Sequence, residues 1–242
     1  MAKSAGLNSS FFLGGFDISG DVSAIDRIAG PRTTYDVTAI NVSATERIYG
    51  RGDAEIDFTT FFNDASGQEH LALRGLPRTD VIALACLQST AGDVCAFTEG
   101  KQIDYNWSRP DDGSLTGKVS VRGDGAALEW GTLVIAKSTV EGTGNSASQD
   151  NGASSAAGAA AVVMCTAFSG SNYTATLQDS TDDSSFATLI AFTQITAVNK
   201  AERKTVSGTI NRYTRVNHAG TFSAVDVIVA IRRGDAADID GY

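Results

Sequence analysis

Residues 80–87, Asp-Val-Ile-Ala-Leu-Ala-Cys-Leu, are apolar at every position after the first. A half-exposed strand alternates apolar and polar side chains, so an unbroken apolar run of this length indicates a strand that is covered on both faces. We therefore expect residues 80–87 to form the middle of a β-sheet and the rest of the first half to be arranged around it.

Strands of a different kind lie on both sides of this run. Apolar and polar residues alternate in segments 34–40, 54–59 and 114–121. A period of two places one face of a strand against the core and the other face in water. Turns rich in Asp and Gly separate these segments, and the first half is therefore predicted to be a β-structure.

One short helix is predicted at residues 66–74. Ser66 and Glu69 have the Ser-x-x-Glu spacing of a capping box, in which the two side chains satisfy free backbone donors at a helix start. Gly75 and Pro77 follow. A left-handed cap at the glycine and a proline without an N–H group are expected to end the helix.

The clearest break in the pattern lies at residues 138–157, which carry no hydrophobic periodicity and are predicted to be a linker or a long exposed loop. Strand patterns then recur at residues 161–165, 173–177, 212–216 and 224–231, as in a β-sandwich. The prediction is a mainly β protein. Residues 1–137 form a β-barrel or sandwich with one short flanking helix, residues 138–157 the linker, and residues 158–242 a C-terminal β-sandwich.

The net charge is −9, from 19 basic and 28 acidic side chains. This balance argues against a surface that binds nucleic acid by neutralising phosphates. No apolar run is long enough for a signal peptide or a membrane span, so we expect a cytosolic chain that does not enter a membrane. Cys86, Cys95 and Cys165 lack Cys-x-x-Cys spacing and are interpreted as small apolar residues in strands.

The residues needed for catalysis are sparse. His70 and His218 are the only histidines, one in each half, and no motif for a nucleophile, a nucleotide or a zinc ion is present. Residues 179–184, Asp-Ser-Thr-Asp-Asp-Ser, resemble part of a calcium loop, but no bidentate acid follows, so a turn is favoured over a cation site. We predict that the protein is not an enzyme and has no catalytic residues, cofactor or metal site.

Aromatic residues leave one alternative open. Trp107, Trp130, Tyr105 and Tyr213 would form a sugar-stacking platform if they lay on one face. Aromatic side chains at alternating strand positions belong more often to the core, which is the interpretation we favour.

A series of short segments follows a distinctive order in the first half. It comprises residues 16–22, Phe-Asp-Ile-Ser-Gly-Asp-Val, then 25–26, 38–41, 46–50 (Glu-Arg-Ile-Tyr-Gly), 53–63, the helix at 66–74, 101–105 and 128–131. This succession, over about residues 8–135, resembles the major tail tube proteins of siphophages, the phages with long non-contractile tails. The second half is similar to the β-sandwich modules that such proteins often carry.

The resemblance implies a structural virion protein. Its copies would close into hexameric rings, and the rings would stack into a hollow tail tube through which genomic DNA passes to the host without specific binding. The expected partners are other copies of the chain, a tape-measure protein, and tail-tip and terminator proteins. The expected location is the phage tail, assembled in the host cytoplasm, with the C-terminal module outside the tube.

Two assembly surfaces follow as hypotheses. The alternating strands near residues 34–40, 54–60 and 114–121 would pair between copies and line the tube, because sheet edges present unpaired backbone groups. Residues 41–53, read as a loop-like stretch, would make the contact between rings. Their mixed charges and aromatic ring suit a self-complementary contact, and the residues proposed for it are Glu46, Arg47, Tyr49, Arg51 and Asp53.

Two other readings remain open. One is a β-sandwich protein that binds carbohydrate or a host surface and stays monomeric. The other is a related tail-completion or distal-tail protein, which would form single rings instead of long tubes.

Overall fold

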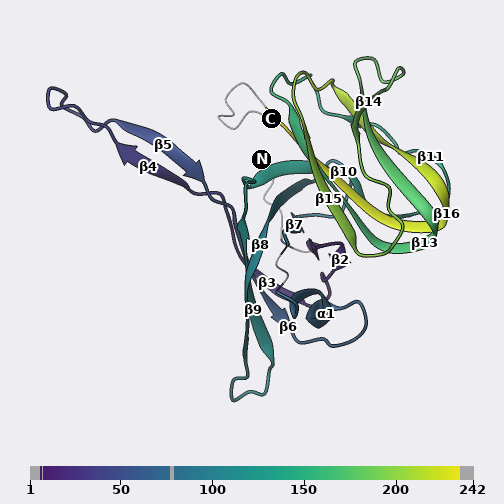
Figure 1. Cartoon of the computed structure of the whole chain (residues 1–242), viewed down its shortest axis with the longest axis horizontal. Helices are drawn as coiled ribbons and strands as arrows, with labels where there is room; N and C mark the ends of the chain where they lie inside the picture. The colour runs from purple at the N-terminus through teal and green to yellow at the C-terminus, as the bar shows by residue number, and fades with distance from the viewer. Residues whose placement is uncertain (1–5, 7, 77–78, 235–242) are drawn as a thin grey trace.

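The computed structural model describes residue 6, residues 8–76 and residues 79–234, and in these residues the protein is mainly β with one short α-helix (Figure 1). The strands form a 14-stranded antiparallel sheet and a separate two-stranded sheet. The predicted fold class is therefore confirmed. The elements are β1 (Ser10–Leu13), β2 (Phe16–Asp17), β3 (Val22–Ala29), β4 (Arg32–Asp36), β5 (Arg47–Gly52), β6 (Glu55–Phe61), α1 (Glu69–Leu73), β7 (Val81–Cys86), β8 (Val94–Ser108), β9 (Thr116–Gly123), β10 (Glu129–Val140), β11 (Gly144–Asn145), β12 (Gln149–Asp150), β13 (Ala159–Ser180), β14 (Ala187–Ala191), β15 (Lys200–Val206) and β16 (Tyr213–Arg233).

Strand β7 is covered on both faces, as its unbroken apolar sequence predicts. It pairs with β1 on one side and β8 on the other. Ile82 and Leu84 point into a cluster shared with β13 and β16, whereas Ala83 and Ala85 point into a second cluster shared with β6 and β9. This burial explains why β7 carries no polar alternation.

Three apolar clusters make up the core. The first lies mainly in the C-terminal half, among the long strands β13 and β16, and includes Val134 and Ile135 of β10. The second lies between those strands and β1, β7 and β8. The third lies under α1, among β1, β6, β7 and β9. Because the second cluster takes side chains from both halves of the sequence, the two halves are joined by buried apolar surface.

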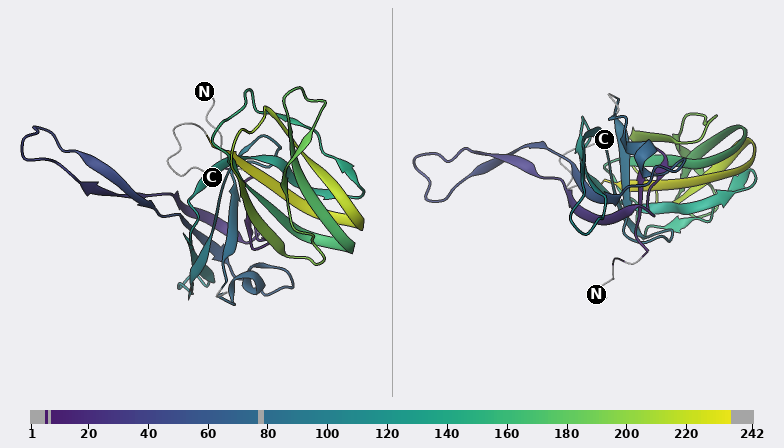
Figure 2. Two further views of the ribbon diagram at one scale, coloured as in Figure 1. Left: turned by 45° about the horizontal axis from the view of Figure 1, so that its top comes forward. Right: turned by 90° about the horizontal axis from the view of Figure 1, so that it is seen from below.

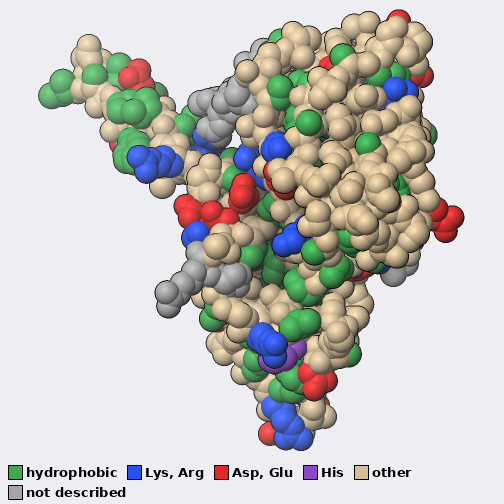
Figure 3. Space-filling model, turned by 45° about the vertical axis from the view of Figure 1, so that its right-hand side comes forward, with side chains coloured by type: hydrophobic (Ala, Val, Ile, Leu, Met, Phe, Trp, Pro, Cys, Tyr) green, Lys and Arg blue, Asp and Glu red, His purple; other side chains and the backbone are tan. Residues whose placement is uncertain are grey.

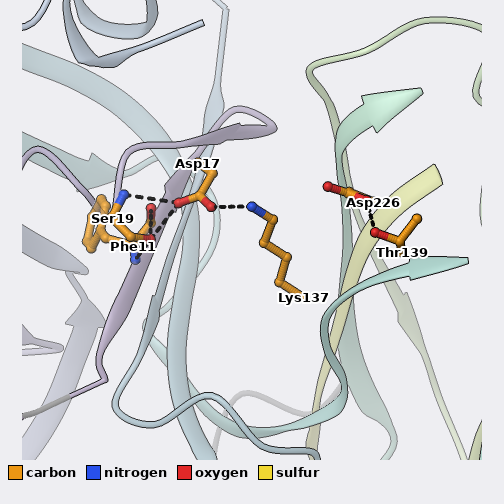
Figure 4. A network of polar contacts seen from close by, with 6 residues as sticks. All are labelled: Phe11, Asp17, Ser19, Lys137, Thr139 and Asp226. Atoms are coloured by element: carbon orange, nitrogen blue, oxygen red, sulfur yellow. Dashed lines mark hydrogen bonds and ion pairs between the residues drawn. The ribbon is translucent and has the colours of Figure 1, made fainter. Parts of the chain in front are cut away.

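A polar network reinforces this junction (Figure 4). Lys137 Nζ on β10 contacts the carboxylate of Asp17 on β2 at 2.7 Å. The same carboxylate accepts hydrogen bonds from Ser19, whose hydroxyl in turn bonds the backbone of Phe11. Beside it, Thr139 on β10 donates to Asp226 on β16 at 2.6 Å. Strand β10 is thus tied by side chains to both halves.

The stretch expected to be a linker, residues 138–157, contains strands. Its first three residues belong to β10, and β11 and β12 pair with β16. An ion pair between Asp150 and Arg212 (2.6 Å) fixes β12 further. The sequence showed no periodicity here because these strands are two residues long and their pairing is a backbone contact with a distant strand.

The helix is shorter than predicted, and its ends differ. α1 begins after Gln68, which makes no side-chain cap, so the expected capping box at Ser66 is wrong. The positive φ near the C-terminal end falls at Leu76 and not at Gly75, and Pro77 lies outside the described residues. The capping box does not form because Glu69 is completely buried and accepts a hydrogen bond from Thr60 of β6 at 3.0 Å.

Burial has an electrostatic consequence for Glu69. It raises the pKa of the carboxyl above its ordinary value, and hydrogen bonds such as the one from Thr60 only partly offset this. Oε2 has no hydrogen-bond partner among the described residues. A carboxyl with a raised pKa in the folded state favours folding while it is protonated and loses that contribution as pH rises through the folded pKa.

We therefore expect Glu69→Gln to stabilise the protein at pH 8, by roughly 1 kcal/mol, the lower end of the cost of an unpaired buried polar group. The gain should shrink toward pH 4, where the wild-type carboxyl is protonated. Urea unfolding at both pH values measures it. The exposed Asp64→Asn is the matched control and should show no such trend. The prediction would be contradicted if the gain in the free energy of unfolding of Glu69→Gln over the wild type were smaller at pH 8 than at pH 4.

Candidate assembly surfaces

A long hairpin projects from the body of the protein (Figures 1 and 2). Strands β4 and β5 pair only with each other, with Tyr35 opposite Ile48 and Asp36 opposite Arg47. We call residues 32–52 the arm. In every view the arm extends away from the rest of the molecule, and none of its residues belongs to the three core clusters.

Hydrogen bonds close the tip of the arm. Val37 N donates to Glu46 O at 2.9 Å, and Glu46 N donates to the Thr38 hydroxyl at 2.8 Å. The carboxylate of Asp36 accepts from Thr38 N at 2.9 Å, and its hydrogen bonds with Thr38 lower the pKa of Asp36. The tip is therefore held in a defined shape without help from the body.

The arm has an apolar face and a charged face. Tyr35 and Ile48 share one face, and the Tyr35 ring lies over Gly50, where a Cβ atom would come within 2.7 Å of the ring. The opposite face carries Arg47 and Tyr49. Alternation in the sequence does therefore correspond to two faces, but neither is buried.

Exposure of the arm's large side chains is its most unusual property. Tyr35 is 58% exposed, Ile48 54% and Tyr49 66%, while Ile40 at the tip is fully exposed. Figure 3 shows hydrophobic side chains along the arm beside those of Lys and Arg. Contiguous exposed apolar residues of this kind mark interaction sites. The expectation that one face of segment 34–40 is buried is wrong for the single chain, because no element among the described residues covers it.

The structure brings the predicted contact residues onto the arm and its base. Glu46 ends the tip, Arg47, Tyr49 and Arg51 lie along β5, and the backbone of Asp53 closes the base by donating to Pro31 O at 2.8 Å. Among the described residues, neither Arg47 nor Arg51 forms an ion pair.

Two details of that prediction change. The stretch 41–53 is not a loop throughout, since half of it is β5. Sequence reasoning also missed Tyr35 as a surface residue, because the alternation of segment 34–40 was assigned to a core, and it did not single out Ile48 within the loop-like stretch. The signal that identifies them is that the hairpin pairs only with itself, and this requires the tertiary structure.

Next to the arm, strands β3, β6, β9 and β8 form a sheet in that order. One face of the sheet packs on the third core cluster through Ile56 and Phe58. The other face is polar and carries two ion pairs, Arg27 with Glu55 (2.7 Å) and Arg122 with Asp57 (2.6 Å). Three segments were expected to line the tube. Segments 54–60 and 114–121 contribute alternate residues to this polar face, whereas segment 34–40 belongs to the arm.

Both edges of this four-stranded sheet are open in the described part of the chain. β3 pairs with β6 alone, and residues 101–108 of β8 pair with β9 alone. A groove of about 610 Å³ runs along β3, between its edge and residues 8–11. Open edges present backbone groups that can pair with another strand.

An aromatic cluster marks the far end of the same sheet. Trp107 contacts Phe62 and Tyr105 edge to face, with ring centroids 5.1 and 5.2 Å apart, and its indole lies against Gly117. His70 Nδ1 is 2.7 Å from the Tyr105 hydroxyl. We call the apolar part of this region the end patch; it consists of the exposed Phe62 and Leu115, the half-buried Trp107, and the exposed Phe61, which lies on the opposite, polar face of the sheet.

The proposed sugar platform does not come together as a set. Tyr105 and Trp107 are in contact, but Trp130 lies on β10, and Tyr213 lies at the start of β16, where it contacts Arg212. Of the four aromatic residues weighed for such a platform, only Tyr105 and Trp107 therefore lie together.

The other residues that were considered for function in the sequence are buried or hydrogen-bonded within the protein. His218 is buried with its Nδ1 2.8 Å from the hydroxyl of Tyr173, and burial lowers the pKa of this histidine. Burial raises the pKa of Cys86 to about 12. The Asp182 carboxylate accepts hydrogen bonds from Ser184 and Ser185 within its own turn. Across the described residues no group of side chains is arranged to hold a metal ion, and no helix is long and apolar enough to cross a bilayer.

Fold and surfaces together define a mainly antiparallel β protein with a projecting hairpin. No family model and no curated protein matches the chain. Among solved structures it is similar to the tail of an empty GTA particle determined with C6 symmetry, with 17% identity, a TM-score of 0.41, and coverage of 52% of this chain and 97% of that one.

Two further similarities are to phage proteins. The SPP1 Dit protein, described as a hub of the adsorption apparatus, is 13% identical, with a TM-score of 0.34 and coverage of 93% of this chain and 99% of that one. A chain of the phage p2 baseplate in its activated conformation is 9% identical, with a TM-score of 0.33 and coverage of 93% and 98%. Similarity at this level does not assign the chain to a family.

Proposed function

We propose that this protein is the major tube protein of a siphophage tail, a structural component whose copies form hexameric rings that stack into a hollow tube. The resemblance of residues 8–135 to such proteins supports the proposal. The observation that carries it is the arm, a self-paired hairpin whose apolar and charged faces are both exposed. A hairpin of this kind is stabilised when a second molecule covers it.

The four-stranded sheet suits ring closure. Its strands alternate in direction, so the open edge of β3 in one copy is antiparallel to the open edge of β8 in the next. Repeating this heterologous contact around an axis closes a ring and leaves no free edge. The polar face would then line the channel, and the apolar face would stay on the core.

The channel would not bind DNA strongly. Two arginines of the polar face are already paired with carboxylates, and the whole chain has a net charge of −9. Phosphate binding requires free cationic groups, so genomic DNA would pass without specific binding. The second half would lie on the outside of the tube, and tape-measure, tail-tip and terminator proteins would contact the tube at its ends, in the virion.

Negative-stain electron microscopy of the purified protein at several concentrations, with light scattering, tests the proposal. Long hollow tubes are the expected result. Single rings that never lengthen would favour a tail-completion or distal-tail role instead. A strictly monomeric particle would overturn the proposal and favour a carbohydrate- or host-surface-binding protein, to be examined with a glycan screen.

Reversing the charge of the arm is expected to weaken assembly. Arg47→Glu or Arg51→Glu should reduce tube yield at least tenfold, because each copy contributes the unpaired cation and the effect repeats at every contact. The melting temperature should not change, since both side chains are exposed. Lys200→Glu, an exposed reversal in the second half, is the control. Unchanged tubes in both arm variants would remove these residues from the contact.

A further inference from the structure

A groove of about 550 Å³ lies where the two halves of the sequence meet. Val94 of β8 and Trp130 and Thr132 of β10 line it from the first half, and Gln149 of β12 and Arg233 of β16 line it from the second. Its volume lies within the range of about 300–1,000 Å³ that is usual for small-molecule sites. Of the described residues that line the groove, none belongs to the arm, to β3 or to the end patch, so it is separate from the proposed assembly surfaces.

The first half contributes an apolar area and a hydroxyl to the groove. Trp130 and Thr132 are two residues apart on β10, so their side chains lie on the same face of the sheet, and Val94 is opposite Thr132 on β8. Trp130 is 48% exposed and Val94 49%. The Thr132 hydroxyl forms no hydrogen bond with a described residue. An uncovered aromatic ring therefore lies beside a polar group that is available to a ligand.

The second half contributes an amide on a strand that is held in place. β12 pairs with β16, with Gln149 opposite Thr214, and the ion pair between Asp150 and Arg212 fixes the strand. Gln149 Oε1 lies over Gly92, where a Cβ atom would come within 3.3 Å of it. Within the described part of the chain the Gln149 side chain has no hydrogen-bond partner. The groove thus offers a ligand both an amide donor and an amide acceptor.

The charged groups of the groove already have partners within the chain. The Asp150 carboxylate accepts two hydrogen bonds from Arg212, at 2.7 and 2.6 Å. The Arg233 guanidinium donates to the backbone oxygens of Ala153 and Ile210. A charged ligand would have to displace these contacts, whereas a neutral one would not. The free groups, a hydroxyl and an amide beside an aromatic ring, suit a neutral ligand with many hydroxyls.

We propose that this groove binds a neutral saccharide, with one pyranose ring stacked on Trp130. A pyranose has an apolar face of C–H groups, which suits the face of an aromatic ring. Its hydroxyls lie around the edge of the ring, where Thr132 and Gln149 would bond them. The site goes beyond the proposed function, because tube assembly does not require it. Where many copies are arrayed, weak sites of this kind would act together on a surface that carries many sugars.

Saturation-transfer difference NMR on the whole protein tests the site, with the methyl glycosides of glucose, galactose and N-acetylglucosamine as probes. We expect at least one probe to receive saturation, mainly at its ring C–H protons. Trp130→Ala should lower the affinity for that probe about tenfold, because the stacking surface is lost. Gln149→Ala should lower it about fivefold, because a neutral hydrogen bond is lost.

Trp107→Phe is the matched control. Trp107 is the second of the two tryptophans in the chain and lies in the aromatic cluster, away from the groove, so this variant should bind like the wild type. Unchanged binding by Trp130→Ala, or an equal loss in Trp107→Phe, would overturn the inference. Absence of saturation transfer to all three probes would overturn it as well.

Circular dichroism and electron microscopy of the same variants separate this inference from the proposed function. Each variant should melt like the wild type and form tubes like it. If Trp130→Ala unfolds, Gln149→Ala decides the question, because it removes only an amide and leaves the ion pair of β12 in place. Wild-type binding by a folded Gln149→Ala protein would then overturn the saccharide site while the proposed function stands. Failure of the wild type to form tubes would overturn the proposed function and leave the site unaffected.

Discussion

Replacing residues 33–51 with a short Gly-Asn-Gly turn is expected to abolish tube formation and leave the body of the protein folded. The arm contributes no side chain to the three core clusters, and its strands pair only with each other. Removing it therefore takes away no buried apolar surface, while a shorter connection slightly lowers the entropy cost of closing the loop. The melting temperature should stay within a few degrees of the wild-type value.

The measurement combines circular dichroism with negative-stain microscopy. Loss of tubes with retention of single rings is the specific outcome, since the proposed ring closure uses the sheet edges and not the arm. Shortening the exposed turn between β13 and β14 at residues 181–185 by two residues is the control for the effect of editing a loop. A protein without the arm that still forms long tubes would contradict the proposed function of the arm.

The largest loss of stability is expected at Glu129. This carboxylate is only 1% exposed, lies at the start of β10, and contacts Arg203 of β15 and Arg232 of β16, each at 3.1 Å. In the Glu129→Ala variant, the largely buried guanidinium groups of Arg203 and Arg232 would lie near each other without the carboxylate that they share. Breaking a buried ion pair by removing one partner costs about 3–5 kcal/mol.

Urea unfolding followed by tryptophan fluorescence measures this loss. Asp150→Ala is the matched control, because it also removes a carboxylate paired with an arginine, but both side chains are more than 40% exposed. Because that pair is exposed to solvent, its loss should cost much less stability than the loss of the Glu129 carboxylate. Similar losses in the two variants would show that Glu129 does not hold the three strands together.

Local pattern predicted the body of the sheet well. The unbroken apolar run at 80–87 became a strand covered on both faces, and the alternating runs at 54–59 and 114–121 became paired strands with one buried and one polar face. These features depend on the side chain at each position and its neighbours, which the sequence contains directly.

The same reasoning failed where a partner far along the chain decides the outcome. The stretch 138–157 forms strands because β16 is next to it, and Glu69 is buried under the helix instead of capping it because Thr60 and Tyr105 lie against it. Glu129 likewise gives no sign in the sequence that it joins three strands. These contacts link residues 9 positions apart for Thr60 and Glu69 and 74 positions apart for Glu129 and Arg203, and no local period in the sequence indicates them.

The candidate assembly surfaces show most clearly which features could be predicted from the sequence and which could not. The strand-forming alternation of the arm, its mixed charge and the resemblance that suggested a contact between rings can all be read from the residues in order. That the hairpin leaves the body, and that the end patch lies at the other end of β6, is visible only once the chain is folded. The physical reason is that periodicity tells which residues share a face of a strand, whereas what covers that face depends on the packing of distant elements or of another molecule.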